Sequence, residues 1–357
     1  MSELFINKKV WQAFTPEQTD AYVNDVFDLY RKKGFPYYPT DMESRTKEFN
    51  KLLRYDFSQL FDPETKAFRQ TMHGLNLAWS YQPHSFGVRC GKLRTPIEAF
   101  EDDDIFKRVI RKRMVRGDNM SDSGIRKTLR VFTGTQGVSN FRPTAAAAIY
   151  KHFCPNGGKV WDMSSGYGGR LLGSYLAGVE YIGTEPCTLN YNGICQMNTD
   201  FNLGGTIHQL GSEVFRPEFE SLDFCFTSPP YFNTEEYSDE ETQSYIKYPT
   251  KELWRDGFLH DTMQNCMYGL KPGCCMAINI NNVKSYPTLE EDTISVAKQV
   301  GFEHIDTYYL ALSKLNGYGF KYEPIFVFKK PLDVSHKECN NVSTLKGNDY
   351  EEPIAIS

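Results

Sequence analysis

The stretch of this chain that says most about its fold is VWDMSSGYGGR, residues 160–170. An apolar run ends at Asp162, and Gly166, Gly168 and Gly169 follow before helical periodicity begins. Glycines let the backbone turn tightly and approach a ligand, and the free amides of a helix start favour a carboxylate or a phosphate. We therefore expect a strand, a ligand-binding turn and a helix here.

The sequence downstream of this turn repeats the alternation of apolar runs and helical periodicity. We expect strands at 159–163, 179–184, 206–210, 221–227, 274–280, 304–312 and 322–328, and helices at 170–177, 189–201, 250–270 and 289–300. Such a succession predicts a parallel sheet with helices on both faces. Only a short turn at 316–319 separates the last two runs, which predicts a hairpin and an antiparallel strand at the edge of the sheet.

An acid follows the second expected strand. Gly183-Thr184-Glu185 lies about 20 residues beyond the glycine turn, where an acid can accept hydrogen bonds from both hydroxyls of a ribose. Together with the glycine turn, Glu185 favours a nucleoside-bearing cofactor over a merely structural turn.

A second motif, Ser228-Pro229-Pro230-Tyr231, follows the fourth expected strand. Two consecutive prolines remove two amide donors and fix the backbone, so that the carbonyls of Ser228 and Pro229 can be aimed into a cleft. The aromatic ring after them can stack on a planar group. Rigid acceptors beside a stacking face suit an exocyclic amine, whose lone pair is delocalised until acceptors draw it out of the ring plane.

Together these motifs resemble those of the S-adenosylmethionine-dependent amino-methyltransferases of DNA. The resemblance covers residues 138–330, and the motif order is similar to the gamma arrangement of that family. It implies an α/β fold, with a Rossmann-like, seven-stranded class I methyltransferase sheet and an antiparallel last strand. The cofactor would be S-adenosylmethionine, and the product a methylated amino group of a DNA base.

The resemblance also implies site residues. The cofactor would be held by Phe141, Arg142 and Thr144 of a closing segment, by Asp162, Ser164, Ser165, Gly166, Gly168 and Gly169, by Glu185 at the ribose, and by Ser212 and Glu213 at the adenine. The family usually has an acid at the first adenine position, where this chain has a serine.

Catalysis would belong to Ser228, Pro229, Pro230 and Tyr231, with the flipped base against Tyr231 and near Phe232 and Asn233. Transfer would depend on positioning and electrostatics, without a covalent intermediate. Within the family, a serine before Pro-Pro favours N4 of cytosine over N6 of adenine.

The region 1–137 is expected to be mainly helical and to take part in substrate recognition. Residues 92–130 carry eleven Lys/Arg against seven Asp/Glu. This stretch is either a solvated helix face or a phosphate-contacting patch, for which we consider Arg111 and Arg113. The segment at 79–84 combines aromatic and polar residues, for which packing is favoured over contact with a base.

Two segments beyond these are acidic. The loop 233–249 is interpreted as a lid or pocket wall, in which Tyr237, Tyr245 and Tyr248 either line the pocket or pack. The tail 331–357 is polar and acidic, which predicts a solvated, disordered segment.

Composition argues against a membrane protein, a secreted protein and a metalloprotein. The net charge is −5, no apolar run is long enough to span a membrane, and no signal pattern begins the chain, so we expect a cytoplasmic protein. The seven His and nine Cys residues lack metal-ligand spacing, so no metal is expected. Aromatic residues make up 14% of the chain, as core or as a surface for stacking bases.

Several interpretations remain open. The leading one is a DNA amino-methyltransferase, such as a modification or protection enzyme of a restriction system. An RNA base methyltransferase is the second. The third is a transferase whose modified cofactor carries an extra carboxylate, neutralised by Arg142 and Arg170. The last is a catalytically silent nucleic-acid binder, against which the intact Ser228-Pro229-Pro230-Tyr231 argues.

Overall fold

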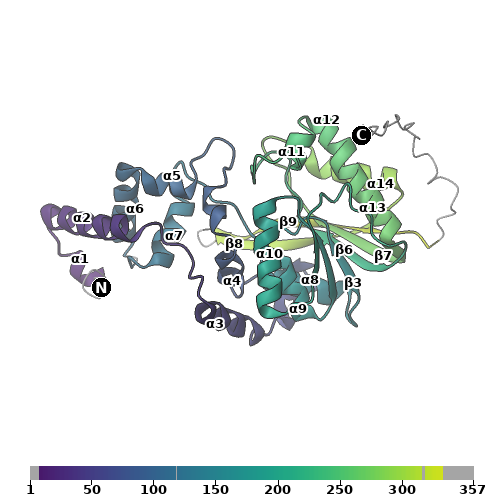
Figure 1. Cartoon of the computed structure of the whole chain (residues 1–357), viewed down its shortest axis with the longest axis horizontal. Helices are drawn as coiled ribbons and strands as arrows, with labels where there is room; N and C mark the ends of the chain where they lie inside the picture. The colour runs from purple at the N-terminus through teal and green to yellow at the C-terminus, as the bar shows by residue number, and fades with distance from the viewer. Residues whose placement is uncertain (1–7, 118, 316–317, 333–357) are drawn as a thin grey trace, which may run out of the picture.

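One mixed sheet runs through the computed structural model, which describes residues 8–117, 119–315 and 318–332 (Figure 1). Within these residues the strand order is β1-β2-β8-β9-β7-β6-β3-β4-β5. The strands are β1 (Phe61–Asp62), β2 (Ala67–Phe68), β3 (Lys159–Asp162), β4 (Glu180–Thr184), β5 (Thr206–His208), β6 (Leu222–Thr227), β7 (Leu270–Asn279), β8 (Glu303–Leu315) and β9 (Tyr318–Lys329).

Helices cover both faces of this sheet, because alternate side chains of its central strands are apolar on both sides. Val160 of β3 and Phe224 of β6 belong to one core cluster, and their neighbours Trp161 and Cys225 belong to the other. The first core lies under α8 (Pro143–Phe153), α9 (Gly169–Ala177) and α10 (Thr188–Phe201). The second lies under a continuous helical segment made of α12 (Lys251–Leu253), a π-helical turn η3 (Trp254–Leu259) and α13 (His260–Gly269), and under α14 (Leu289–Val300). The short α11 (Ser244–Lys247) precedes this segment.

Close helix packing fixes the region that precedes the glycine turn. A Cβ on Gly173 of α9 would lie 2.5 Å from the Cβ of Ala146 in α8, which leaves no room for any side chain larger than glycine. Small residues at this crossing let α8 and α9 approach closely. The segment that enters α8 is thereby held against the glycine turn that enters α9.

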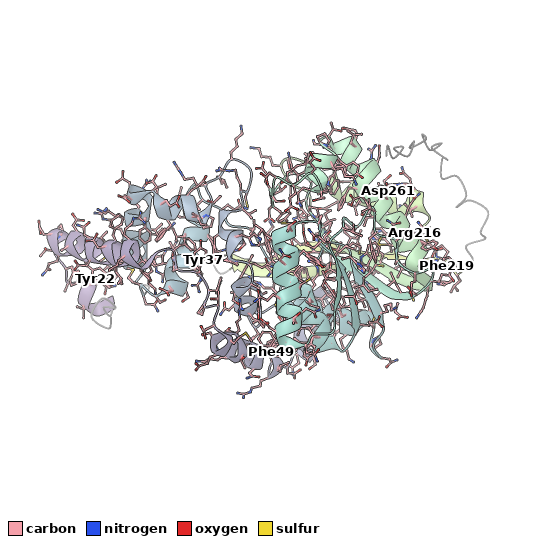
Figure 2. All side chains as sticks on the ribbon, viewed as in Figure 1. Tyr22, Tyr37, Phe49, Arg216, Phe219 and Asp261 are labelled. Atoms are coloured by element: carbon pink, nitrogen blue, oxygen red, sulfur yellow. The ribbon has the colours of Figure 1, made fainter. Side chains whose placement is uncertain are left out.

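The N-terminal region adds a helical lobe with its own core. Val23 and Val26 pack with Phe106 and Ile110 in a cluster separate from those of the sheet. Figure 1 shows α2, α5, α6 and α7 at one end of the molecule, and in Figure 2 Tyr22 lies there while Arg216 and Phe219 lie at the opposite end. The helices of this region are α1 (Lys8–Trp11), α2 (Pro16–Lys33), α3 (Met42–Leu53), α4 (Leu75–Ser80), α5 (Pro96–Glu101), α6 (Asp103–Arg116) and α7 (Asp122–Arg130), with 3₁₀ turns η1 (Ser58–Leu60) and η2 (Pro83–Gly87).

The predicted fold class, an α/β sheet with helices on both faces and an antiparallel last strand, is confirmed. Two details differ from the prediction. The sheet has nine strands instead of seven, because β2 pairs in parallel with β8 through Ala67↔Tyr309 and brings β1 with it. The last strand β9 is not at the edge but between β7 and β8, with both of which it pairs antiparallel.

Some predictions fall on residues outside the described ranges. These are the acidic tail beyond Leu332 and part of the turn at 316–319. Across the described ranges, no helix combines the length and the apolar character that a bilayer crossing requires.

Candidate active site

A cavity of about 410 Å³ lies at the carboxyl ends of the parallel strands and brings the three predicted constellations together. It is the position at which open α/β sheets bind ligands. The predicted residues that line it are Phe141, Arg142, Ser164, Ser165, Gly166, Glu185, Ser212, Glu213, Ser228, Pro229, Pro230 and Tyr231.

The glycine turn has the backbone that its sequence predicted. Gly166 has φ +60° and Gly168 has φ +80°, both in the left-handed region that favours glycine. The amide of Gly166 donates to Oε2 of Glu185 at 2.7 Å, so the turn after β3 is tied to the acid after β4. The turn and the acid therefore form one wall of the cavity.

Glu185 is nearly completely buried beneath this turn. Its other oxygen accepts from the amide of Cys187 at 3.0 Å. Burial raises the pKa of Glu185 to about 7, against the lowering effect of the Cys187 and Gly166 amides. The carboxyl therefore changes charge near neutral pH and gains from any further hydrogen-bond donors that a ligand brings.

Asp162, predicted as a cofactor contact, does not line the cavity. Its carboxylate is fully buried and accepts from Arg170 Nε at 2.8 Å, from the Tyr181 hydroxyl at 2.7 Å and from Thr227 Oγ1 at 3.1 Å. Through these hydrogen bonds Asp162 of β3 connects to β4, β6 and α9, so its role is to hold the glycine turn in position.

Three more predicted cofactor residues lie behind the cavity wall. Thr144 is fully buried and accepts from the amide of Thr71 at 3.1 Å. Gly168 and Gly169 do not line the cavity, and a Cβ on Gly169 would lie 1.9 Å from the carbonyl oxygen of Phe141. The closing segment therefore rests directly on the start of α9.

All four residues of Ser228-Pro229-Pro230-Tyr231 line the cavity. Burial, followed by the charge of Glu323, raises the pKa of Tyr231 far above its ordinary value, while a hydrogen bond with Ser228 opposes the shift. The hydroxyl of Tyr231 lies 3.5 Å from the carbonyl oxygen of Asn279 at the end of β7. The Tyr231 hydroxyl is therefore neutral and is held between Ser228 and Asn279.

The two residues after the motif do not join it. Phe232 has φ +57°, a turn that carries its ring away from the cavity into the core beside Trp254 and Tyr286. Asn233 is exposed and also outside the cavity lining. The structure therefore places neither of these two predicted base contacts in the cavity lining, because the chain turns sharply at Phe232.

The arginines considered for phosphate contact are occupied elsewhere. Arg113 is buried in the helical lobe and donates to the carbonyls of Asn119 and Gly124 and to Thr128. Arg111 is exposed and pairs with Asp20 at 2.6 Å. The assignment of Arg113 as a phosphate contact is therefore corrected to a structural role, since α6 turns this side chain toward α7.

Two polar side chains hold the end of the cavity beside Ser212, Lys247 from the loop 233–249 and Thr262 from α13. Glu213 forms an ion pair with Lys247 at 2.8 Å, and Ser212 Oγ lies 2.7 Å from Thr262 Oγ1. In the described part of the chain, the buried amide nitrogen of Gln243 has no hydrogen-bond partner. It lines the cavity, as does Tyr167, whose buried hydroxyl also lacks a partner there. These unsatisfied atoms fit a polar ligand.

The acidic loop forms part of the cavity wall. Tyr237 and Tyr245 line the cavity, whereas Tyr248 packs on Gly257. Glu235 accepts from the amide of Ser139 at 3.3 Å and from the Tyr237 hydroxyl at 2.5 Å, and burial raises its pKa. The loop is thereby joined to the closing segment.

Sequence reasoning missed one side of the cavity. Gln70, Asn279, Leu310, Leu312 and Glu323 line it from β7, β8, β9 and the residues after β2. A lone acid within the apolar run 322–328 was the available signal for Glu323. Gln70 carried no signal, because its place depends on the unexpected pairing of β2 with β8. Among the described residues, no His, Cys, Asp and Glu side chains cluster in a way that could hold a metal ion.

No family model matches the chain, and no curated protein matches its sequence. Three solved structures illustrate the similarity. A TehB-like SAM-dependent methyltransferase from Corynebacterium glutamicum is 16% identical over 66% of this chain and 100% of its own, with a TM-score of 0.37. A SAM-dependent methyltransferase from Methanosarcina mazei is 10% identical over 52% of this chain and 98% of its own, with a TM-score of 0.38.

A SAM-dependent O-methyltransferase from Thermotoga maritima is 13% identical over 56% of this chain and 69% of its own, with a TM-score of 0.38. Because these TM-scores are low, the functional interpretation rests on the residues of the cavity.

Proposed function

We propose that this protein transfers a methyl group from S-adenosylmethionine to the exocyclic amino group of a base in DNA, with N4 of cytosine favoured over N6 of adenine. The observation that carries the proposal is a single cavity lined by the Gly166 turn, Glu185 and Ser228-Pro229-Pro230-Tyr231. Nucleoside-binding and amine-orienting groups thus face the same space.

The polar groups of the cavity fit this cofactor. Glu185 would accept hydrogen bonds from the ribose hydroxyls, and the unpartnered Gln243 amide would meet the adenine. Arg142 lines the cavity, its guanidinium forms no hydrogen bond or ion pair with another described residue, and it would face the methionine carboxylate. When bound, the cofactor supplies an electrophilic methyl group on a positively charged sulfur.

The motif after β6 would orient the acceptor. The Ser228 hydroxyl and the Pro229 carbonyl would accept hydrogen bonds from the amino group, which turns the nitrogen lone pair out of the base plane. The Tyr231 ring, held neutral by burial, would stack on the base. Positioning of this kind can supply a large share of the rate enhancement.

Two observations bear on the competing functions. Arg170 is buried in an ion pair with Asp162, so of the two arginines considered for a modified cofactor only Arg142 remains available. Glu185, once ionised, places a negative charge in the cavity, which suits a cationic sulfur better than a second carboxylate.

The test is incubation of the full chain with methyl-labelled S-adenosylmethionine and with separate pools of DNA and RNA, followed by digestion to nucleosides. We expect label in N4-methylcytosine from DNA. Label in RNA alone would replace DNA by RNA as the substrate. No labelled nucleoside from either pool, with cofactor binding intact by calorimetry, would overturn the proposal.

A further inference from the structure

The cavity extends along the sheet well beyond the cofactor residues. Its lining passes from Glu185 after β4, through Ser228 after β6 and Asn279 at the end of β7, to Glu323 of β9. In the order β4-β3-β6-β7-β9 these strands span four spacings of about 4.8 Å, or roughly 19 Å. One end therefore has room for a second planar group beside the cofactor, with Ser228 between the two.

Glu323 stands at that second end beside apolar walls. It lies opposite Leu310 in the β8–β9 register, and Leu310 and Leu312 line the cavity with it. No other described residue forms a hydrogen bond or ion pair with its carboxyl. The side chain is half-buried, and because its carboxyl lacks a partner among these residues it can hydrogen-bond to a ligand in the cavity.

The backbone next to Glu323 is fixed relative to the catalytic motif. The carbonyl of Pro324 accepts from Asn279 Nδ2 at 3.0 Å and from the amide of Ile280 at 3.3 Å. The carbonyl of the same Asn279 lies 3.5 Å from the Tyr231 hydroxyl. Asn279 thus connects the backbone beside Glu323 to the Tyr231 hydroxyl, which fixes Glu323 relative to the Tyr231 ring.

Electrostatics favours a neutral carboxyl at this place. Burial raises the pKa of Glu323 above its ordinary value of 4.5, and Lys321 on the same strand opposes the rise. Tyr231 after β6 and Glu235 of the acidic loop line the same cavity, and burial raises the pKa of both, while the charge of Arg170 opposes the rise at Tyr231. A protonated carboxyl can donate a hydrogen bond, which a carboxylate cannot.

Building on the proposed function, we propose that the target base enters the β7–β9 end of the cavity and that Glu323 determines which bases are accepted. Its carboxyl O–H donates to the unprotonated ring nitrogen next to the amino group, N3 of cytosine or N1 of adenine. Uracil and thymine lack the amino group, and guanine carries an N–H at N1, which would meet the O–H with a second donor while the carboxyl keeps this orientation. A site with its donor held in that orientation therefore favours cytosine and adenine.

The test compares Glu323→Ala, Glu323→Gln and the matched control Glu303→Gln, an exposed acid on the same hairpin outside the cavity. The kcat/KM is measured with an unmethylated oligonucleotide that the wild type methylates. The Kd of the cofactor is measured by calorimetry. Glu323→Ala should lower kcat/KM about 10- to 100-fold, the usual cost of a lost hydrogen bond to such a group. Glu323→Gln should stay within about fivefold of the wild type, because its amide N–H donates to the same nitrogen. The control and all cofactor affinities should stay unchanged.

A substrate analogue identifies the atom that is recognised. Replacing the target base by 3-deazacytosine or 1-deazaadenine removes the ring nitrogen that accepts the hydrogen bond. This analogue should lower the kcat/KM of the wild type as much as Glu323→Ala does. Glu323→Ala should show no further loss of kcat/KM with the analogue. As pH rises, wild-type kcat/KM should fall where Glu323 loses its proton, and Glu323→Gln should lack this fall. Titration of Glu235 would affect both proteins alike, and titration of Glu185 would raise cofactor affinity in both.

The outcomes separate the inference from the function it rests on. Equal kcat/KM for Glu323→Ala and wild type, or equal damage by Gln and Ala, would overturn the role of Glu323 and leave methyl transfer standing. Failure of the wild type to methylate any base would overturn both.

Discussion

His84 and Asn190 are joined by a contact of 2.7 Å between Nε2 of the imidazole and Oδ1 of the amide. The backbone carbonyl of Asn190 also accepts from Gln82 Nε2 at 3.1 Å. Asn190 lines the cavity and hydrogen-bonds to Glu185. Since burial lowers the pKa of His84, the ring is neutral and carries its proton on Nε2. The N-terminal region thereby orients the amide that meets the buried acid.

Replacing His84 by Ala should weaken cofactor binding about fivefold, because Asn190 loses the donor that orients its amide toward Glu185, worth about 1 kcal/mol. The Kd from calorimetry checks this. His260→Ala is the matched control, since His260 lies on α13 outside the cavity lining. An unchanged Kd in His84→Ala would mean that the contact with Asn190 is only structural.

Cofactor affinity should rise with pH through the titration of Glu185. Its pKa of about 7 in the ligand-free protein means that below pH 7 the carboxyl must lose a proton before ribose hydroxyls can donate to it. The association constant should therefore increase about tenfold between pH 6 and pH 8. Glu185→Gln should bind more weakly and show no such dependence when the Kd is measured across this range.

The same group has the opposite effect on stability without ligand. A folded-state pKa raised from 4.5 to about 7 gives a stability contribution that is present at low pH and is lost as pH rises through 7. Chemical denaturation at pH 5 and pH 8 should show that Glu185→Gln loses less stability over this interval than wild type. An equal loss in both would show that Glu185 does not titrate near neutral pH.

Tyr231→Ala should reduce methyl transfer at least about 100-fold while cofactor affinity stays within twofold, because in the proposed function the ring stacks on the acceptor base and does not contact the cofactor. Tyr231→Phe should retain most activity, since it keeps the ring and loses only the hydrogen bond with Ser228 and the 3.5 Å contact with Asn279. Single-turnover transfer and calorimetry measure the two quantities. If Tyr231→Ala also abolished cofactor binding, the motif would belong to the cofactor end.

The two arginines once considered for phosphate should behave differently. Arg113→Ala should lower the free energy of unfolding by about 2–4 kcal/mol, since it removes buried hydrogen bonds to Asn119, Gly124 and Thr128. Arg111→Ala removes one exposed pair with Asp20 and should cost under about 1 kcal/mol. Urea denaturation separates the two. A fall in the salt dependence of DNA binding by Arg111→Ala would restore its role as a phosphate contact.

How far the sequence predicted this site depends on the range of the interactions involved. The Gly166 turn, Glu185 and Ser228 through Tyr231 were found because each follows its own strand directly, so local pattern places it. Phe232 was misplaced because the pattern does not show a left-handed turn at a non-glycine residue. Gln70 depends on the pairing of β2 with the distant β8, and the place of Glu323 at the cavity depends on the insertion of β9 beside β7, and periodicity contains neither.

Gly169→Ala is a sharp test of the contact between the closing segment and α9. At this first position of α9 alanine is a better helix former than glycine, so propensity alone predicts a gain. A Cβ there would lie 1.9 Å from the carbonyl oxygen of Phe141, and backbone must move to admit it. We expect a net loss of about 1–3 kcal/mol and weaker cofactor binding, because Phe141 and Arg142 shift with the segment. Gly87→Ala, whose Cβ would meet only Ile97 at 3.7 Å, is the control and should bind cofactor normally. Equal stability and affinity for Gly169→Ala and wild type would show that the closing segment is not held against α9.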